Sequence, residues 1–181
     1  MDQLRIENIK ELPRIKPSIY EELPSTNSLL KELAKDGAQE GRLILAQGQS
    51  AGRGRKGKSF FSPKNTGLYM SLLLRPKAGV TVELLTAATA VAISRAVKDT
   101  LGLELAIKWV NDIYYKGKKV GGILTEGSFS RGPCPDYIIV GLGLNLYQPE
   151  GGFPQELTLA GALLDKKQEG LLNLLVKQIL E

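Results

Sequence analysis

Residues 105–126 read LAIKWVNDIYYKGKKVGGILTE, and this stretch decides which kind of sheet the chain builds. Two strand-like runs flank Lys116-Gly117-Lys118, which is typical of the turn of a β-hairpin. The strands of a hairpin are antiparallel. The turn would therefore return Lys119 close to Asp112 and set a cation beside a carboxylate.

The rest of the chain alternates short apolar runs with turn residues and carries one long helical pattern. We predict strands over residues 19–23, 42–47, 67–75, 105–109, 113–115, 119–126 and 137–146, the last of them central. We predict helices from a cap at Ser25 or Thr26 to Gly37, and over residues 81–101, 158–164 and 170–180. The polar segment 1–17 is predicted to be peripheral. Together these elements predict an α+β domain with a mixed, largely antiparallel sheet covered by helices.

Size and composition restrict the chemistry. A chain of 181 residues, 43% hydrophobic and 24% charged, is long enough to form one domain with a real core. It has no histidine, which excludes histidine triads, histidine metal sites and imidazole acid–base catalysis. The single cysteine, Cys134, cannot form an intramolecular disulfide, and this favours a reducing cytoplasm. No apolar run reaches the roughly 20 residues that span a bilayer, and the N-terminus does not resemble a signal peptide.

A glycine- and arginine-rich loop, QSAGRGRKGK at residues 49–58, predicts an anion-binding site. Its glycines let backbone N–H groups approach a ligand, and Arg53 and Arg55 carry planar forks that suit carboxylate or phosphate. A flexible, solvated basic loop is the simpler alternative, because Gly/Arg runs are common in solvated or RNA-binding segments. Residues 52–59 also match the P-loop pattern GxxxxGKS. A P-loop requires a helix next, whereas the Pro, Asn and Gly within residues 60–67 predict a turn.

Two further glycine motifs leave structural and functional interpretations open. Gly121-Gly122 suits a β-bulge or tight packing, and it also suits a ligand that approaches the backbone closely. In GLGLN, residues 141–145, glycines alternate along a buried strand, so one face is bare and has room for a flat ligand or another backbone. The motif is not a dinucleotide fingerprint, because Leu146 occupies the third glycine position and no helix is predicted to follow.

Four segments, in order, resemble the catalytic domain of the biotin protein ligases. They are Ser25-Thr26-Asn27, the GRGRxG loop that begins at Gln49, KWxND with the following KxxGILxE, and GLGLN. The resemblance covers about residues 18–165 and implies the class II synthetase-like fold that biotin and lipoate ligases share. Lipoate ligases carry a different loop, so a lipoate or octanoate ligase is the alternative that the loop disfavours.

The resemblance also implies roles for individual residues. It implies catalytic roles for Lys119, Arg53 and Asp112, with Asp112 as the Mg²⁺ contact. It implies biotin contacts from Ser25, Thr26, Asn27, Gln49, Gly52, Arg53, Gly54, Arg55, Lys119 and Gly122. It implies ATP or adenylate contacts from Arg53, Arg55, Lys56, Gly57, Phe60, Trp109, Asn111, Lys119 and Asn145. The sequence departs from the family pattern at Phe60, where Trp is usual, and at Val110, where Pro is usual.

The implied activity is that of a biotin–[acetyl-CoA-carboxylase] ligase. Such an enzyme uses ATP and Mg²⁺ to convert biotin to biotinyl-5′-AMP, releases pyrophosphate, and transfers biotin to a lysine of a biotin carboxyl carrier protein domain. Too few residues precede Ser25 for a DNA-binding domain, and too few follow the last predicted helix for a C-terminal β-barrel. Residues 1–181 are thus expected to be a single catalytic domain with neither DNA nor membrane as a partner. A homodimer that forms through a sheet edge stays an open alternative, and no residue pattern supports it.

A nucleic-acid-binding module is the remaining alternative. It would use the Gly-Arg loop together with interleaved aromatic residues or a continuous basic face. Aromatic residues make up only 6% of the chain, and the positive charges are confined to loops. The sequence therefore favours an enzyme over such a module.

Overall fold

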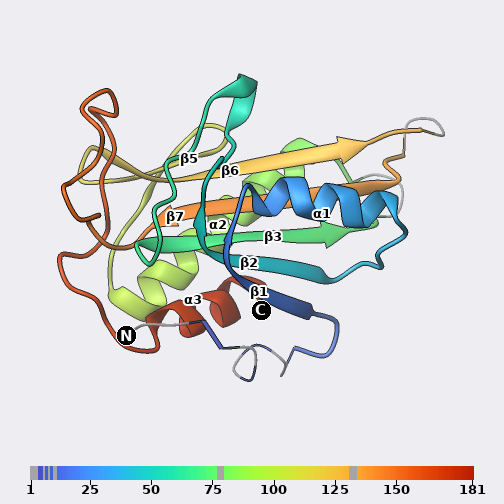
Figure 1. Ribbon diagram of the computed structural model, residues 1–181, viewed down its shortest axis with the longest axis horizontal. Coiled ribbons are helices and arrows are strands. Elements are labelled where there is room, and N and C mark those ends of the chain that lie inside the picture. Colours follow the sequence, from blue (N-terminus) through green and yellow to red (C-terminus); the bar gives the residue numbers. More distant parts are fainter. Residues whose placement is uncertain (1–3, 6, 8, 10–11, 77–79, 131–133) are drawn as a thin grey trace.

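The protein is built on one seven-stranded sheet, shown by a computed structural model that describes residues 4–5, 7, 9, 12–76, 80–130 and 134–181 (Figure 1). The strand order is β1-β2-β3-β7-β6-β5-β4. The strands are β1 Lys16–Leu23, β2 Arg42–Gln49, β3 Gly67–Leu74, β4 Ala106–Lys108, β5 Asp112–Tyr115, β6 Lys118–Ser128 and β7 Tyr137–Asn145. β1 pairs with β2 in parallel, and the other neighbouring pairs are antiparallel. The predicted mixed sheet, its central last strand and the β5–β6 hairpin are confirmed.

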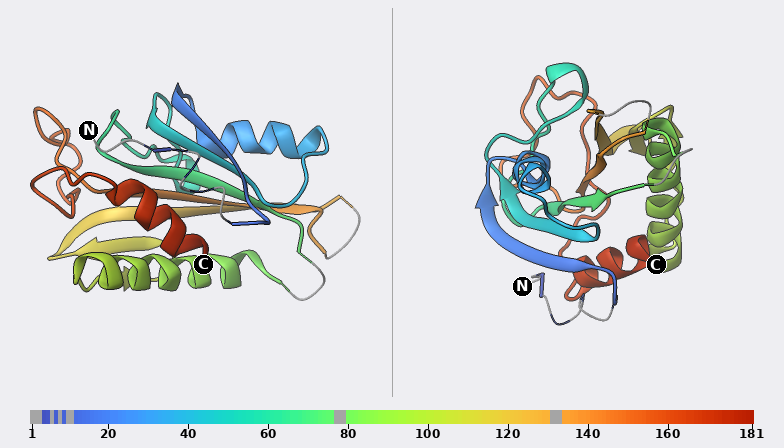
Figure 2. Two further views of the ribbon diagram at one scale, coloured as in Figure 1. Left: turned by 90° about the horizontal axis from the view of Figure 1, so that it is seen from below. Right: turned by 90° about the vertical axis from the view of Figure 1, so that its right-hand side faces the viewer.

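Helices cover both faces of the sheet (Figure 2). α1 (Thr26–Lys35) lies on one face, while α2 (Val82–Leu101) and α3 (Leu171–Leu180) lie on the other. Ser25 caps α1 because its hydroxyl accepts a hydrogen bond from Ser28 N–H, and Thr81 caps α2 in the same way. Gly102 ends α2 with a φ of 68°, a left-handed conformation that favours glycine.

Two apolar clusters fix the helices on the sheet. On one face, Leu30 and Ala34 of α1 pack against Ile44, Leu73 and Ile139. On the other face, α2 and α3 cover a larger cluster that reaches from β2 to β5. Each fully buried Leu or Ile contributes about 1.5–3 kcal/mol relative to an exposed one. The sheet and the N-terminus of α1 therefore form a rigid frame for the polar residues between them.

The predicted helix over residues 158–164 is wrong, because Thr158 and Leu159 lie in a turn and Ala160 and Leu164 then form single β-bridges to Lys119 and Tyr147. Lys119 N–H donates to Leu159 O at 2.6 Å, and Gly161 N–H donates to Lys119 O at 2.9 Å. A helix would use these backbone groups internally and leave those of Lys119 unpaired. Gly161 suits the close approach, since a Cβ there would lie 2.6 Å from Lys118 Cβ.

Smaller differences concern the ends of the chain and of the strands. The predicted peripheral segment 1–17 lies partly outside the described residues, and β1 begins at Lys16 instead of residue 19. The strand predicted over residues 105–109 is limited to Ala106–Lys108. Among the described residues, no helix combines the length and the apolar character needed to cross a bilayer.

Candidate active site

Glycines on two adjacent strands form the floor of a pocket. Tyr69 of β3, Gly143 of β7, Gly122 of β6 and Asp112 of β5 lie in one row across the sheet. The two central members have no side chain, so the row is open between Tyr69 and Asp112. The predicted bare face of β7 is confirmed. A Cβ at Gly143 would lie 2.5 Å from the ring of Phe60, which packs over this floor.

A β-bulge brings Lys119 to the same face of the sheet. The β5–β6 register shifts between Ile113 and Tyr114, and Val120 is the extra residue on β6. Strict alternation would place Lys119 and Gly122, three residues apart, on opposite faces. Instead Lys119 Cε lies 3.8 Å from a Cβ built on Gly122, and Lys119 Nζ donates to Asp112 Oδ1 at 2.6 Å. The predicted pairing of Lys119 with Asp112 is confirmed.

The first turn of α1 supplies the polar end of the pocket. Gln49 Oε1 accepts hydrogen bonds from Thr26 N–H at 2.9 Å and from Thr26 Oγ1 at 3.2 Å. The Gln49 amide nitrogen donates to Ser62 Oγ at 2.9 Å. Ser71 Oγ lies 2.6 Å from Asn27 Oδ1 and 2.7 Å from Thr26 Oγ1. Because these groups bond to one another, their donors and acceptors are oriented before any ligand arrives.

The glycine–arginine loop is folded across the mouth of the pocket. Phe60 N–H donates to Gly52 O at 2.9 Å, and Gly54 N–H donates to Lys58 O at 2.7 Å. The loop contains one 3₁₀ turn, Arg55–Gly57, and then continues to β3 without a helix. The rejection of a P-loop is therefore confirmed. Arg53 and residues 55–59 are exposed, so the alternative of a solvated basic loop stays open.

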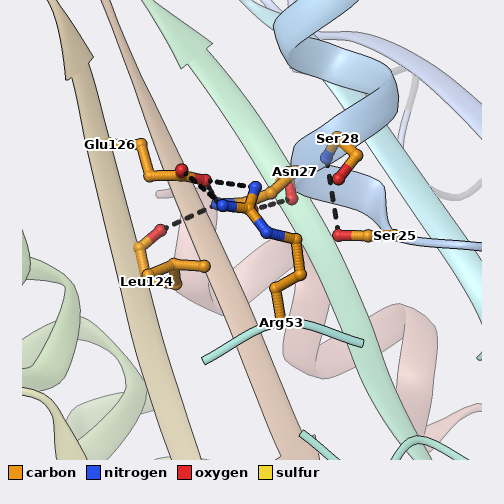
Figure 3. Close-up of polar contacts among 7 residues, drawn as sticks. Ser25, Asn27, Ser28, Arg53, Leu124 and Glu126 are labelled. Carbon is orange, nitrogen blue, oxygen red and sulfur yellow. Dashed lines mark hydrogen bonds and ion pairs between the residues drawn. The ribbon is translucent and has the colours of Figure 1, made fainter. Parts of the chain in front are cut away.

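Both arginines of the loop contact strands or turns of the sheet. Arg53 Nη1 and Nη2 donate to the two carboxylate oxygens of Glu126 at 3.0 and 2.9 Å (Figure 3). Arg55 Nη1 donates to Asn111 Oδ1 at 3.1 Å. These contacts place two permanent cations at the pocket mouth. Neither arginine is buried, so both guanidinium groups keep access to a ligand.

The resulting cavity has a volume of about 290 Å³. Its lining residues are Ser25, Thr26, Asn27, Gln49, Arg53, Gly54, Arg55, Lys56, Lys58, Ser59, Phe60, Asn111, Asp112, Lys119, Gly122, Ile123, Leu124, Gly141, Leu142 and Gly143. Five of these side chains are cationic and one, Asp112, is a carboxylate. Such an excess of positive charge around a partly enclosed space favours an anionic ligand.

Four residues with predicted ligand contacts lie outside this lining. Gly52 and Gly57 belong to the loop that covers the pocket. Trp109 is 79% exposed beyond the end of β4. Asn145 ends β7, is 6% exposed, and its amide donates to Gly161 O at 3.1 Å. In the described structure Asn145 therefore holds Gly161, which also pairs with Lys119, and its contact with a ligand stays a prediction.

Glu126 and Ser71 both belong to the polar network, although no role was predicted for either residue. Alternation along β6 could have indicated Glu126, because Gly122, Leu124 and Glu126 are two residues apart and share a face. Ser71 had no such signal. It lies in the apolar run of β3 and is paired with Gly141 only through the sheet register.

Asp112 fits a magnesium contact when the ligand supplies further oxygens. Among the described residues, no group of three His, Cys, Asp or Glu side chains could hold a metal ion. Asp112 Oδ1 accepts hydrogen bonds from Lys119 and from Asn111 Nδ2, which leaves Oδ2 for a cation. Mg²⁺ is commonly held by one or two carboxylates together with substrate phosphates. The donor set therefore suits Mg²⁺ bound to a nucleotide.

Fold and site together define a protein with a cationic pocket over a glycine floor, between a helix N-terminus and an arginine loop. The chain belongs to the biotin/lipoate A/B protein ligase family, whose family model matches residues 20–145.

The relatives of the chain include enzymes and a solved complex. It is 39% identical over 139 residues to the bifunctional ligase/repressor BirA of Bacillus subtilis (strain 168), a match that covers 76% of this chain and 42% of that protein. It is 40% identical over 128 residues to the biotin–[acetyl-CoA-carboxylase] ligase of Paracoccus denitrificans, a match that covers 67% of this chain and 51% of that ligase. The biotin protein ligase from Aquifex aeolicus, solved in complex with biotin and ATP, matches with a TM-score of 0.74 at 32% identity. This match covers 91% of the present chain and 68% of the Aquifex chain. The predicted ligase fold is confirmed, and the chain spans about half the length of these two curated relatives.

Proposed function

We propose that this chain is the catalytic domain of an ATP-dependent biotin protein ligase. The observation that carries the proposal is the pocket itself. Hydroxyl and amide groups of Ser25, Thr26 and Gln49 lie at one end, and Lys119 lies beyond a glycine floor, beside Asp112. Biotin has a neutral ureido head and a carboxylate tail, so it would place its head at α1 and its carboxylate near Lys119. The Aquifex aeolicus relative, solved with biotin and ATP, supports these substrates.

The first step in this proposal joins two anions. A carboxylate oxygen of biotin attacks the α-phosphorus of ATP, the bond from that phosphorus to the bridging oxygen breaks, and pyrophosphate leaves. Lys119 would neutralise the carboxylate and the α-phosphate, while Arg53 and Arg55 bind the phosphates. Charge neutralisation and alignment of this kind need no histidine. Mg²⁺, held by Asp112 and the phosphates, would add further positive charge at the phosphates.

The second step transfers the acyl group. The ε-amine of an acceptor lysine attacks the acyl carbon of biotinyl-5′-AMP, an amide bond forms, AMP leaves and the amine loses a proton. We propose a biotin carboxyl carrier protein domain as the acceptor, as the name of the Paracoccus denitrificans relative suggests. The arginine loop over the pocket would keep water away from the activated acyl group.

The remaining residues take supporting roles in this proposal. Asn27 and Gly122 would border the bound biotin, and Phe60 and Asn111 would border the adenylate. Lys56 would add charge near the phosphates, while Gly52, Gly54 and Gly57 give the loop its backbone freedom. Trp109 and Asn145 would contact the nucleotide only after a rearrangement. A cytoplasmic location is proposed from the single, free cysteine.

The test is adenylate formation by the purified chain. It would be incubated with Mg-ATP and either biotin or lipoate, with pyrophosphate release and bound acyl-AMP measured by mass spectrometry. Biotinyl-AMP from biotin alone would support the proposal. Lipoyl-AMP from lipoate would favour the alternative lipoate or octanoate ligase. The absence of both adenylates, in protein shown to be folded by circular dichroism, would contradict the proposal for this chain.

A further inference from the structure

Glu126 of β6 joins the arginine loop to the first turn of α1. Its Oε2 accepts hydrogen bonds from Arg53 Nη1 and from Asn27 Nδ2, both at 3.0 Å, and its Oε1 accepts from Arg53 Nη2 at 2.9 Å. Figure 3 shows the guanidinium of Arg53 lying between its own loop and the Glu126 carboxylate. One carboxylate thus holds two side chains that line the pocket from different elements.

The contact fixes the orientation of Arg53 without using all of its donors. Arginine has five N–H donors, and the pairing with Glu126 uses two of them. The remaining donors, including Nε–H, stay available for a second anion. A bidentate arginine–carboxylate pair also fixes the plane of the guanidinium. The described geometry therefore allows Arg53 to bind Glu126 and a ligand anion at the same time.

Asn27 connects Glu126 to the polar end of the pocket at the first turn of α1. The Asn27 amide also donates to Leu124 O at 3.1 Å, and Asn27 Oδ1 lies 2.6 Å from Ser71 Oγ. The Asn27 side chain is thereby fixed to the sheet. Through Glu126, this fixed group anchors a loop that would otherwise have to be ordered when the ligand binds, at a cost in conformational entropy.

We propose that Glu126 is a positioning residue, which holds Arg53 at the pocket mouth and keeps the loop partly closed before the anionic ligand binds. The inference rests on the proposed function, in which Arg53 contacts the adenylate. A purely structural ion pair is the alternative. The two side chains are 42% and 21% exposed, and pairs with this much solvent contact contribute little to stability. Neutralising Glu126 should therefore affect ligand binding far more than folding.

The experiment uses the full chain and four variants: Glu126→Gln, Arg53→Ala, the double variant, and Glu104→Gln as a control. Glu104 lies just beyond the end of α2 and forms an exposed ion pair with Lys98 of that helix. Both residues are far from the loop in sequence. The dissociation constant of a non-hydrolysable biotinyl-adenylate analogue is measured by calorimetry. The rate of tryptic cleavage at Arg53 and Arg55 is measured without ligand.

Glu126→Gln should raise the dissociation constant about tenfold, the effect of losing one charge-assisted contact. It should also speed tryptic cleavage of the loop, whereas Glu104→Gln should change neither value. In the Arg53→Ala background, Glu126→Gln should change the dissociation constant by less than about twofold, since residues that act through one another are not additive.

Two results would overturn the inference alone. One is an unchanged or tighter dissociation constant for Glu126→Gln, and the other is an equally large effect with Arg53 absent. Glu126→Asp, which keeps the charge but shortens the side chain, replaces Glu126→Gln if the latter does not fold. Failure of the wild-type protein itself to bind the analogue would instead overturn the proposed function, and the role of Glu126 with it.

Discussion

Lys119 Nζ and Asp112 Oδ1 lie 2.6 Å apart on the two strands of the β5–β6 hairpin. Their side chains are 35% and 25% exposed, so water screens the pair and its contribution to stability is small. The main consequence of the pair is that it fixes the position of the Lys119 side chain. A free lysine side chain would lose rotamer entropy when it binds a ligand, and the carboxylate has already ordered it beside the glycine floor.

Replacing Lys119 by Ala should remove the central cation of the proposed first step. We expect kcat/KM for pyrophosphate release to fall by about 10²–10³-fold, as when one preorganised charge-stabilising donor is lost. The matched control is Lys118→Ala, because the amine of this neighbour donates to Thr158 O and does not line the pocket. Wild-type turnover in Lys119→Ala would show that the cation is not needed.

A side chain at Gly141 should disturb the polar end of the pocket. A Cβ there would lie 2.0 Å from Asn27 Oδ1, which is held by Ser71. We expect Gly141→Ala to lower the free energy of unfolding by about 1–3 kcal/mol. At Gly122, the nearest heavy atom to an added Cβ is 3.7 Å away, and the change should stay within about 0.5 kcal/mol. Urea unfolding of the two variants tests this difference, and equal values would contradict it.

Ser71 should matter both for stability and for biotin. It is fully buried, and its hydroxyl bonds with two residues that line the pocket, Thr26 and Asn27. Ser71→Ala should cost about 1–3 kcal/mol because buried partners lose a hydrogen bond, and it should weaken biotin binding measured by calorimetry. Ser94→Ala is the control, since that hydroxyl only donates to Ala90 O within α2. If both variants bound biotin equally well, the network would be irrelevant to the ligand.

Stability should fall at alkaline pH because of Tyr69. Burial raises the pKa of Tyr69 from 10.0 to about 12, and the hydrogen bond with Thr66 opposes this shift. Below pH 10.0 the phenol is neutral in both the folded and the unfolded chain, so its contribution is complete. As the pH rises toward about 12, the unfolded chain loses the proton first, and stability falls by up to about 1.4 kcal/mol per pH unit.

The comparison with Tyr69→Phe isolates this effect from other titrating groups. The variant cannot ionise at this position. The unfolding free energies of wild type and variant are measured by urea unfolding from about pH 9 to pH 11. Wild type should lose stability relative to Tyr69→Phe as the pH rises. A constant difference across this range would mean that the pKa of Tyr69 is not raised in the folded protein.

Local patterns in the sequence predicted most of the frame. Thr81 and Gly102 bound α2 as predicted, since caps and left-handed glycines act within a few residues. The hairpin at Lys116–Lys118 placed Lys119 near Asp112 for the same local reason. The helix predicted over residues 158–164 failed because backbone groups of Lys119, distant in sequence, form hydrogen bonds with Leu159 and Gly161 of this segment.

The sequence by itself determined most of the elements, the caps of α1 and α2, the bare glycine face of β7 and the family resemblance, because each depends on residues close together in the chain or on a motif. Only the tertiary structure decided which side chains meet. The bulge at Val120 turns Lys119 toward Gly122, and the register of β3 with β7 sets Ser71 beside Gly141. Folding of the loop then brings Arg53 to Glu126 across 73 residues. Such contacts depend on strand register and packing between distant segments, which local propensity does not encode.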